Sequence, residues 1–226
     1  MTSVNFIPFE YYTGLENMAK DETLLNDLVE KEGRKPTFRL YGWKPACVSL
    51  GRNQKEDFLD KEFLKECNID VVTRLTGGRA LLHDQEVTYS FVCPQNLLEN
   101  GASVMGSYKE ISQILINAFA RLGIEVTLGG DSVHTKHDYC MLVSTGADLN
   151  YQGKKLVGSA QCRKKGYILQ HGSILYDYDK ELLEQIFKEP VDSTQVTTIK
   201  EILNCSIENF CKDFQIALTR SLSELF

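Results

Sequence analysis

Strand-like runs fill most of the chain up to about residue 176, and this pattern limits the possible folds more than any other feature. The runs are short, rich in β-branched and aromatic residues, and bounded by glycine, proline or polar turns. They cover residues 5–12, 37–43, 46–51, 69–75, parts of 73–92, 124–128 and much of 140–176. Because strands outnumber a simple β-α alternation, the sequence predicts an α+β fold with a mixed or antiparallel sheet and helices packed on it.

Four helical patterns accompany the strands. A capping box formed by Thr13 and Glu16 opens the first, which we expect to end before Gly33. The others are predicted over residues 55–67, from 103 or 107 to about 122, and in the C-terminal stretch that begins near 206. No repeat, low-complexity tract or linker marks a boundary, so the sequence predicts a single domain over residues 1–226.

Composition excludes several classes of function. With a net charge of -6 and a pI near 5.3, the chain lacks the clustered cations that nucleic acid binding requires. No apolar run approaches the roughly 18 residues of a membrane span, and no basic and apolar leader begins the sequence. The seven cysteines are scattered, without a C-x-x-C pair, which is typical of a reducing compartment. These features predict a cytoplasmic protein whose partners are neither nucleic acid nor membrane.

Two glycine-containing segments invite comparison with phosphate loops. "RLTGGRA" and "QGKKLVGS" both place glycines beside basic residues, but neither matches G-x-x-x-x-G-K-[ST], and no G-x-G-x-x-G opens a helix. From the pattern alone, the simpler interpretation is that Gly77 and Gly78 supply positive φ in a tight hairpin between two strands.

A third segment, "HTKHDYC", offers His134, His137 and Cys140 at three-residue spacing. The spacing would suit zinc if the segment were helical, but its glycine-rich entry indicates a loop and no fourth ligand lies nearby, so no metal is predicted. Cys140 is instead the best placed of the seven cysteines to act as a nucleophile, with Lys155 and His171 on strands downstream.

Four segments together resemble one superfamily. "TGLENMAKDETLL", "ACVSLGRNQ", "RLTGGRALLHDQEVTYS" and "GKKLVGSAQCRKKGYILQHGSIL" occur in the order found in biotin/lipoate protein ligases and octanoyltransferases. Within that superfamily the pattern is most similar to the LipM type of octanoyltransferase, which works through a cysteine thioester. The resemblance implies a fold like that of class II aminoacyl-tRNA synthetases and biotin-lipoate ligases.

The resemblance also implies roles for particular residues. Cys140 would be the nucleophile and Lys155 the acyl-site lysine. The implied substrate-binding residues are Arg74, Gly77, Gly78, His83, Gly158, Ser159, Ala160, His171 and Gly172. The implied reaction carries octanoyl from octanoyl-acyl carrier protein, through Cys140, to a lysine of a lipoyl domain or glycine cleavage H protein, and it requires no cofactor.

Two alternatives share the same motifs. An ATP-dependent lipoate-protein ligase would use ATP and Mg and form a lipoyl-adenylate, but this chain has Arg79 where ligases typically place a third glycine. A non-catalytic acyl-binding or carrier-binding module would be expected to lose the nucleophile or the lysine, and both are present. Because carrier proteins are commonly acidic, we also expect a local basic patch, built from Arg163, Lys164 and Lys165, to help dock them.

Overall fold

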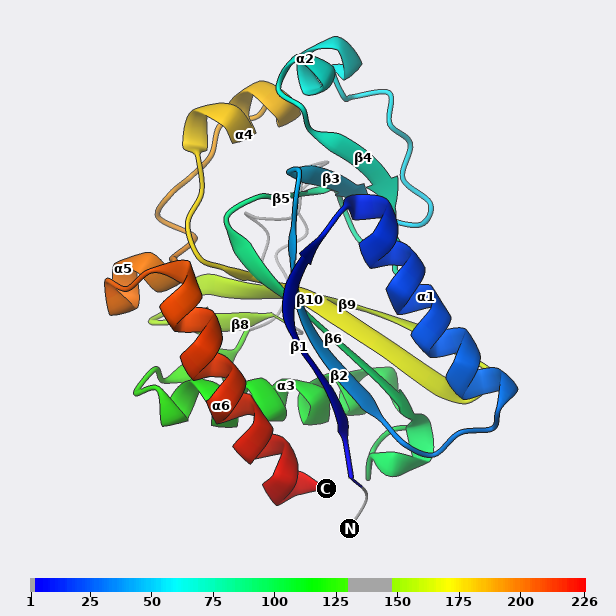
Figure 1. Ribbon diagram of the computed structural model, residues 1–226. Coiled ribbons are helices and arrows are strands. Elements are labelled where there is room, and N and C mark those ends of the chain that lie inside the picture. Colours follow the sequence, from blue (N-terminus) through cyan, green and yellow to red (C-terminus); the bar gives the residue numbers. More distant parts are fainter. Residues whose placement is uncertain (1–2, 130–147) are drawn as a thin grey trace.

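The computed structural model describes residues 3–129 and 148–226, and these form two sheets surrounded by helices (Figure 1). The larger sheet has seven strands in the order β1-β2-β6-β10-β9-β8-β7. They are β1 (Asn5–Tyr12), β2 (Thr37–Trp43), β6 (Glu86–Pro94), β10 (Tyr167–Leu175), β9 (Lys154–Lys164), β8 (Leu149–Tyr151) and β7 (Val126–Leu128). Only β1 and β2 pair in parallel, and every other neighbouring pair is antiparallel, so the predicted mixed sheet is confirmed.

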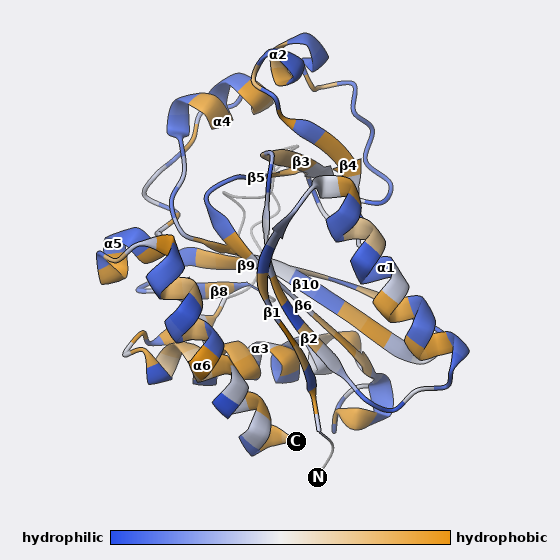
Figure 2. Cartoon of the chain, in the orientation of Figure 1, coloured by the Kyte–Doolittle hydropathy of each residue, from blue (hydrophilic) through white to orange (hydrophobic). Residues whose placement is uncertain are grey.

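Helices cover both faces of this sheet. α1 (Gly14–Glu30) packs on one face, where Leu25 contacts Val92 and Leu169. α3 (Val104–Arg121) and α6 (Ile207–Leu225) pack together on the other face, over the main core. Each of these helices carries both hydrophobic and hydrophilic residues (Figure 2), as a helix half-buried on a sheet requires. The shorter elements are the 3-10 helix η1 (Gln95–Leu97), α4 (Lys180–Phe187) and α5 (Ile199–Leu203).

A second, three-stranded sheet sits at one end of the first (Figure 1). Its order is β4-β3-β5, made of β4 (Asp70–Thr73), β3 (Cys47–Leu50) and β5 (Leu81–His83). β3 therefore lies between the two strands that flank Gly77 and Gly78, and the tight hairpin predicted there is wrong. The physical reason is that β4 runs parallel to β3 while β5 runs antiparallel to it, so residues 74–80 must cross over β3.

Local sequence signals located most elements well. The Thr13 side chain accepts a hydrogen bond from the Glu16 amide and the Glu16 carboxylate accepts one from the Thr13 amide, which confirms the capping box. The helix predicted over residues 55–67 is shorter, because α2 (Lys61–Glu66) begins only after Asp60 caps it. Among the residues described, no helix is both long and apolar enough to cross a membrane.

Candidate active site

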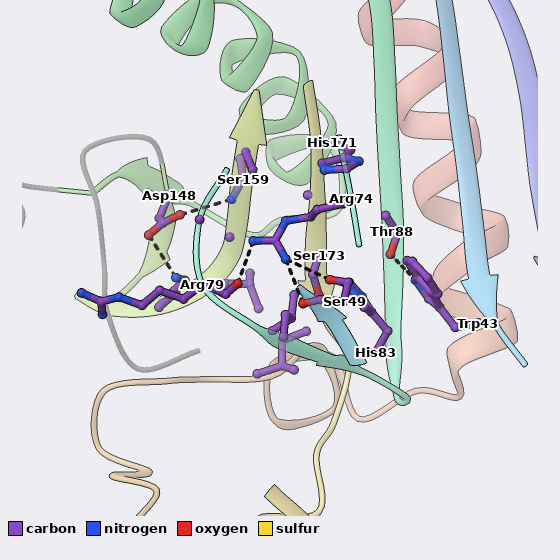
Figure 3. A pocket seen from close by; sticks show the side chains of 18 of the residues that line it. Trp43, Ser49, Arg74, Arg79, His83, Thr88, Asp148, Ser159, His171 and Ser173 are labelled. Carbon is purple, nitrogen blue, oxygen red and sulfur yellow. Dashed lines mark hydrogen bonds and ion pairs between the residues drawn. The ribbon is translucent and has the colours of Figure 1, made fainter. Parts of the chain in front are cut away.

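A cavity opens where β9 and β10 meet the small sheet, and Figure 3 shows the residues around it. Most of the accessible surface of its wall is apolar, and polar side chains converge on it, a combination common in binding sites for small apolar ligands. The apolar wall is formed by Met18, Tyr41, Trp43, Leu81, Leu156, Leu175 and Val196.

Lys155 places a buried cation in this wall. Its Nζ lies 3.1 Å from Asp148 Oδ2, and the side chains of the two residues are only 8% and 3% exposed. The other Asp148 oxygen, Oδ1, accepts a hydrogen bond of 3.2 Å from the Ser159 amide, as Figure 3 shows. Because a buried charge is costly without a partner, this carboxylate explains how the cavity can hold an ammonium group.

The backbone of Lys155 is fixed by a distant segment. Its amide donates to the Gln195 carbonyl at 2.9 Å, and its carbonyl accepts from the Thr197 amide at 3.0 Å. On the other side, Gly129 and Asp148 are joined by a backbone hydrogen bond of 2.7 Å. The backbone of Asp148 thus pairs with Gly129, while its carboxylate lines the cavity.

Arg74 uses its guanidinium to hold the loop that follows β4. Nη1 donates to the carbonyl and hydroxyl of Ser49, at 2.9 and 3.0 Å. Nη2 donates to the carbonyls of Gly77 and Arg79, at 3.0 and 2.7 Å. Arg74 lines the cavity, as the resemblance implies. These bonds show that it also holds the backbone that forms part of the cavity wall.

Gly78 is required at its position by both backbone angle and space. Its φ is +101°, and a Cβ there would lie 2.7 Å from Arg74 Nη2. Beneath it, a Cβ on Gly51 would lie 1.9 Å from the Gly78 carbonyl oxygen, so the two backbones touch. The prediction of positive φ for this glycine pair is confirmed at Gly78, although the turn is not a hairpin.

This difference between the two glycines gives a testable prediction. Gly78→Ala should lower the free energy of unfolding by about 1–3 kcal/mol, because alanine must adopt a left-handed conformation and displace Arg74. Gly77→Ala is the matched control: its backbone is not in that region and nothing lies within 4 Å of its Cβ. Its unfolding free energy should change by less than about 0.5 kcal/mol in urea titrations. Equal losses in the two variants would contradict this account.

His171 connects the cavity to α1. Its Nδ1 lies 3.1 Å from Asp21 Oδ2, and its Nε2 lies 2.7 Å from Thr76 Oγ1. Asp21 is 1% exposed and also accepts hydrogen bonds from Arg39 at 3.0 Å and Ser90 at 2.9 Å. The carboxylate therefore orients His171, and Thr76 ties the following glycines to β10.

The environment of the Asp21 carboxylate predicts that the free energy of unfolding falls at acid pH. Burial raises its pKa, but the hydrogen bond and charge of His171, together with Arg39 and Ser90, lower the pKa below its ordinary value of 3.8. A group with a depressed folded pKa stabilises the protein above its unfolded pKa and loses that contribution as pH falls through the folded value. The stability difference between wild type and Asp21→Asn, measured in urea, should therefore shrink from about pH 6 to pH 3. A constant difference would refute the prediction.

His83 is held like His171, between a carboxylate and a hydroxyl, on the side of the cavity next to the small sheet. Its Nε2 lies 2.7 Å from Ser49 Oγ, and its Nδ1 lies 2.8 Å from Glu86 Oε1. The imidazole stacks on Trp43 with ring centroids 4.0 Å apart, and the Trp43 indole N–H donates to Thr88 Oγ1 at 2.7 Å. Ser49, Trp43, His83 and Thr88 all line the cavity.

The residues implied by the resemblance largely meet at this cavity. Nine of them line it: Arg74, Gly78, His83, Lys155, Gly158, Ser159, Ala160, His171 and Gly172. Gly77 belongs to the same loop but is absent from the lining. Cys140, with His134 and His137 of the zinc alternative, lies outside the described residues, and no cluster of potential metal ligands is found in the described ranges.

Close strand packing explains the small residues on β9 and β10. Gly172 pairs with Ser159, and a Cβ on Gly172 would lie 2.5 Å from the Gly158 carbonyl oxygen. His171 pairs with Ala160, which places both at the cavity. The small side chains therefore leave space in the cavity beside the two strands.

Sequence reasoning missed several polar residues of the site. Asp148, Ser49, Thr88 and the buried Asp21 carried no local signal, because each acquires its role only through a long-range contact. Glu86 was missed as well, although it follows His83 by only three residues and contacts its Nδ1.

The predicted basic patch needs a correction at Arg163. Its guanidinium donates to the carbonyls of Gly101, Ala102 and Ser103 at 2.6–3.1 Å, so it holds the entry to α3. Arg163 is half-buried, and these bonds tie its guanidinium to the start of α3. Lys164 and Lys165 are exposed, and the Lys164 ammonium donates to Asn26 Oδ1 at 2.7 Å.

The six cysteines in the described ranges are free thiols, and none of them lines the cavity. Burial raises the pKa of Cys162 to about 11 and the pKa of Cys93 and Cys211 to about 12, and it also raises the pKa of Cys47. A thiol must lose its proton to act as a nucleophile, so these four are poorly suited to that role.

The fold and cavity define a lipoate-ligase-like α+β domain. A crystal structure of lipoate-protein ligase A bound with ATP superimposes with a TM-score of 0.81 at 23% identity, covering 100% of this chain and 85% of that one. At that identity the likeness establishes the fold.

The chain belongs to the lipoyl protein ligase A/B catalytic domain family, whose model matches residues 13–219. It is 39% identical over 195 residues to octanoyltransferase LipM of Geobacillus kaustophilus, covering 82% of this chain and 69% of that protein. It is 40% identical over 200 residues to octanoyltransferase LipM of Staphylococcus epidermidis, covering 83% and 71%. The family implied by the sequence motifs is therefore confirmed.

Proposed function

We propose that this protein is an octanoyltransferase of lipoate biosynthesis. It would take octanoyl from octanoyl-acyl carrier protein onto Cys140 and pass it to a lysine of a lipoyl domain or glycine cleavage H protein. The observation that carries the proposal is the buried Lys155–Asp148 pair in an apolar cavity, in a chain about 40% identical to octanoyltransferases. Asp148 follows Cys140 by only eight positions in the sequence.

The proposed chemistry is two successive acyl transfers. The Cys140 thiolate attacks the carrier thioester, and the carrier thiol leaves with a proton. The acceptor lysine then attacks the Cys140 thioester, forming an amide and regenerating the thiol. Because an amide is more stable than a thioester, the sequence of steps needs no ATP.

The positive charge of Lys155 and its position in the cavity wall suit this chemistry. An ammonium beside the acyl carbonyl stabilises the thiolate and the oxyanion that forms on attack, and the effect is strong where water is excluded. Asp148 keeps the ammonium in position and offsets its burial. The apolar wall around Trp43 and Leu156 suits an unbranched acyl chain.

The carrier proteins would dock at exposed cations beside the cavity strands. Lys164 and Lys165 lie at the turn between β9 and β10, and both are exposed. Their charges would attract an acidic carrier and raise the association rate. A cytoplasmic location is part of the proposal, since the six described cysteines are unpaired thiols.

One experiment separates this function from ATP-dependent ligation. The protein is incubated with octanoyl-acyl carrier protein in the absence of ATP and examined by intact mass spectrometry. An octanoyl adduct that hydroxylamine removes is expected, followed by transfer to an added lipoyl domain. Modification that requires ATP and free lipoate would instead identify a ligase.

A further inference from the structure

We propose that Ser49 is a second acyl-accepting nucleophile in the same cavity, activated by His83 and Glu86, and that it gives the protein a hydrolytic activity toward medium-chain acyl esters and thioesters. The acyl class rests on the proposed function, because it assumes that this cavity holds octanoyl. The nucleophile itself rests on the geometry of Ser49, His83 and Glu86.

The three residues have the connectivity of a Ser-His-acid triad. Ser49 Oγ lies 2.7 Å from His83 Nε2, and His83 Nδ1 lies 2.8 Å from Glu86 Oε1. All three are buried, with exposed fractions of 1%, 6% and 2%. The acid is thus placed to hold the imidazole and to stabilise the imidazolium that forms when His83 takes the serine proton.

Hydrogen bonding fixes the tautomer needed for this role. The Glu86 carboxylate accepts from Nδ1–H, which leaves the Nε2 lone pair to accept the Ser49 hydroxyl proton. Arg74 Nη1 donates to Ser49 Oγ at 3.0 Å and occupies one of its two lone pairs. The other lone pair is available for attack, and the guanidinium stabilises negative charge developing on the oxygen.

Stacking against Trp43 keeps the imidazole in this orientation. The two rings are 16° from parallel and 4.0 Å apart, so His83 cannot rotate without losing the contact. Trp43 and Leu81 extend the apolar wall beside Ser49, where an acyl chain would lie. The triad therefore faces a cavity that already suits its substrate.

A second hydrogen-bonded series of an acid, a histidine and a hydroxyl in this protein can be compared with the Ser49 triad. Asp21, His171 and Thr76 are linked in the same way, at 3.1 and 2.7 Å. Thr76 is fully buried and does not line the cavity, whereas Ser49 does. Only the Ser49 chain combines an acid, a histidine, a neighbouring cation and a hydroxyl at the cavity wall.

The proposed reaction balances without any further reagent. Ser49 Oγ attacks the acyl carbonyl carbon, its proton passes to His83 Nε2, and the bond to the leaving alcohol or thiol breaks as His83 returns the proton to it. Water then attacks the Ser49 ester with His83 as base, releasing the free acid and restoring the serine.

Covalent labelling tests this proposal separately from the Cys140 chemistry. The Cys140→Ala protein is treated with octyl fluorophosphonate, which loses fluoride as a serine oxygen–phosphorus bond forms. The adduct should map to the peptide containing Ser49. His83→Gln in the same background should slow labelling at least about 100-fold, the usual contribution of a general base. Thr76→Val removes a hydroxyl that bonds His171 but does not line the cavity, and it should slow labelling less than about 5-fold.

A gain-of-reactivity variant provides a second, independent measurement. Ser49→Cys in the Cys140→Ala background, given p-nitrophenyl octanoate, should form an octanoyl adduct that hydroxylamine removes. No adduct at position 49 with either reagent, or labelling rates unaffected by His83→Gln, would overturn the proposal. Neither result would count against the proposed transfer through Cys140, because that transfer is measured separately, in the protein that retains Cys140.

Discussion

Cys140→Ala is expected to abolish the octanoyl thioester formed from octanoyl-acyl carrier protein and to lower transfer to a lipoyl domain by at least about 10⁴-fold. The physical reason is that the variant lacks the atom that becomes acylated, and loss of a nucleophile typically costs about 10⁴–10⁶ in rate. The measurement combines intact mass spectrometry with single-turnover transfer rates.

The matched control for this variant is Cys67→Ala. Cys67 is an exposed cysteine at the end of α2, so its removal should leave the adduct and the rate unchanged. An adduct that persists in Cys140→Ala and is lost in Cys67→Ala would place the acylated thiol elsewhere. Loss in both variants would indicate that the assay reports folding rather than chemistry.

Lys155→Met is expected to have the second large effect, on both rate and stability. Methionine keeps much of the side-chain volume but removes the ammonium, so the acyl-transfer rate should fall about 10²–10⁴-fold. The Asp148 carboxylate would also remain buried without its ion-pair partner. The free energy of unfolding should therefore fall by about 3–5 kcal/mol.

Two further variants separate these effects. Lys154→Met removes a neighbouring lysine on the same strand that is exposed, so it should change neither the rate nor the stability appreciably. Adding Asp148→Asn to Lys155→Met should recover part of the lost stability, because the uncompensated charge is gone, without recovering the rate. Recovery of both would show that Lys155 acts only as a structural partner.

Local signals predicted the parts of the fold that depend on neighbouring residues. The bounds of β1 and β2 were predicted as the structure has them, and Thr13 marked the start of α1. The insertion of β3 between β4 and β5 could not be predicted, because strand pairing is decided by contacts between segments far apart in sequence. Gly77 and Gly78 are compatible both with a tight hairpin and with the observed crossover, so they do not distinguish the two topologies.

The site was predictable where motifs placed residue types together, and not where partners come from elsewhere. Lys155 and His171 came from the motif resemblance, but their partners Asp148 and Asp21 come from a loop end and a helix. Arg163 shows a further limit: a run of cations suggests a docking surface, and only the folded chain reveals the carbonyls to which this guanidinium donates. Exposure is a property of packing, which a sequence pattern does not contain.

The backbone bonds that Lys155 makes with Gln195 and Thr197 have a consequence for the order in which the protein is assembled. During synthesis the strand carrying the lysine emerges about forty residues before the segment that fixes it, so a nascent chain can form much of the sheet before it can form the reactive site. The lysine reaches its final setting only when nearly all of the fold's strands are already in place. The role proposed for Lys155 can therefore begin only after the walls of the cavity have formed.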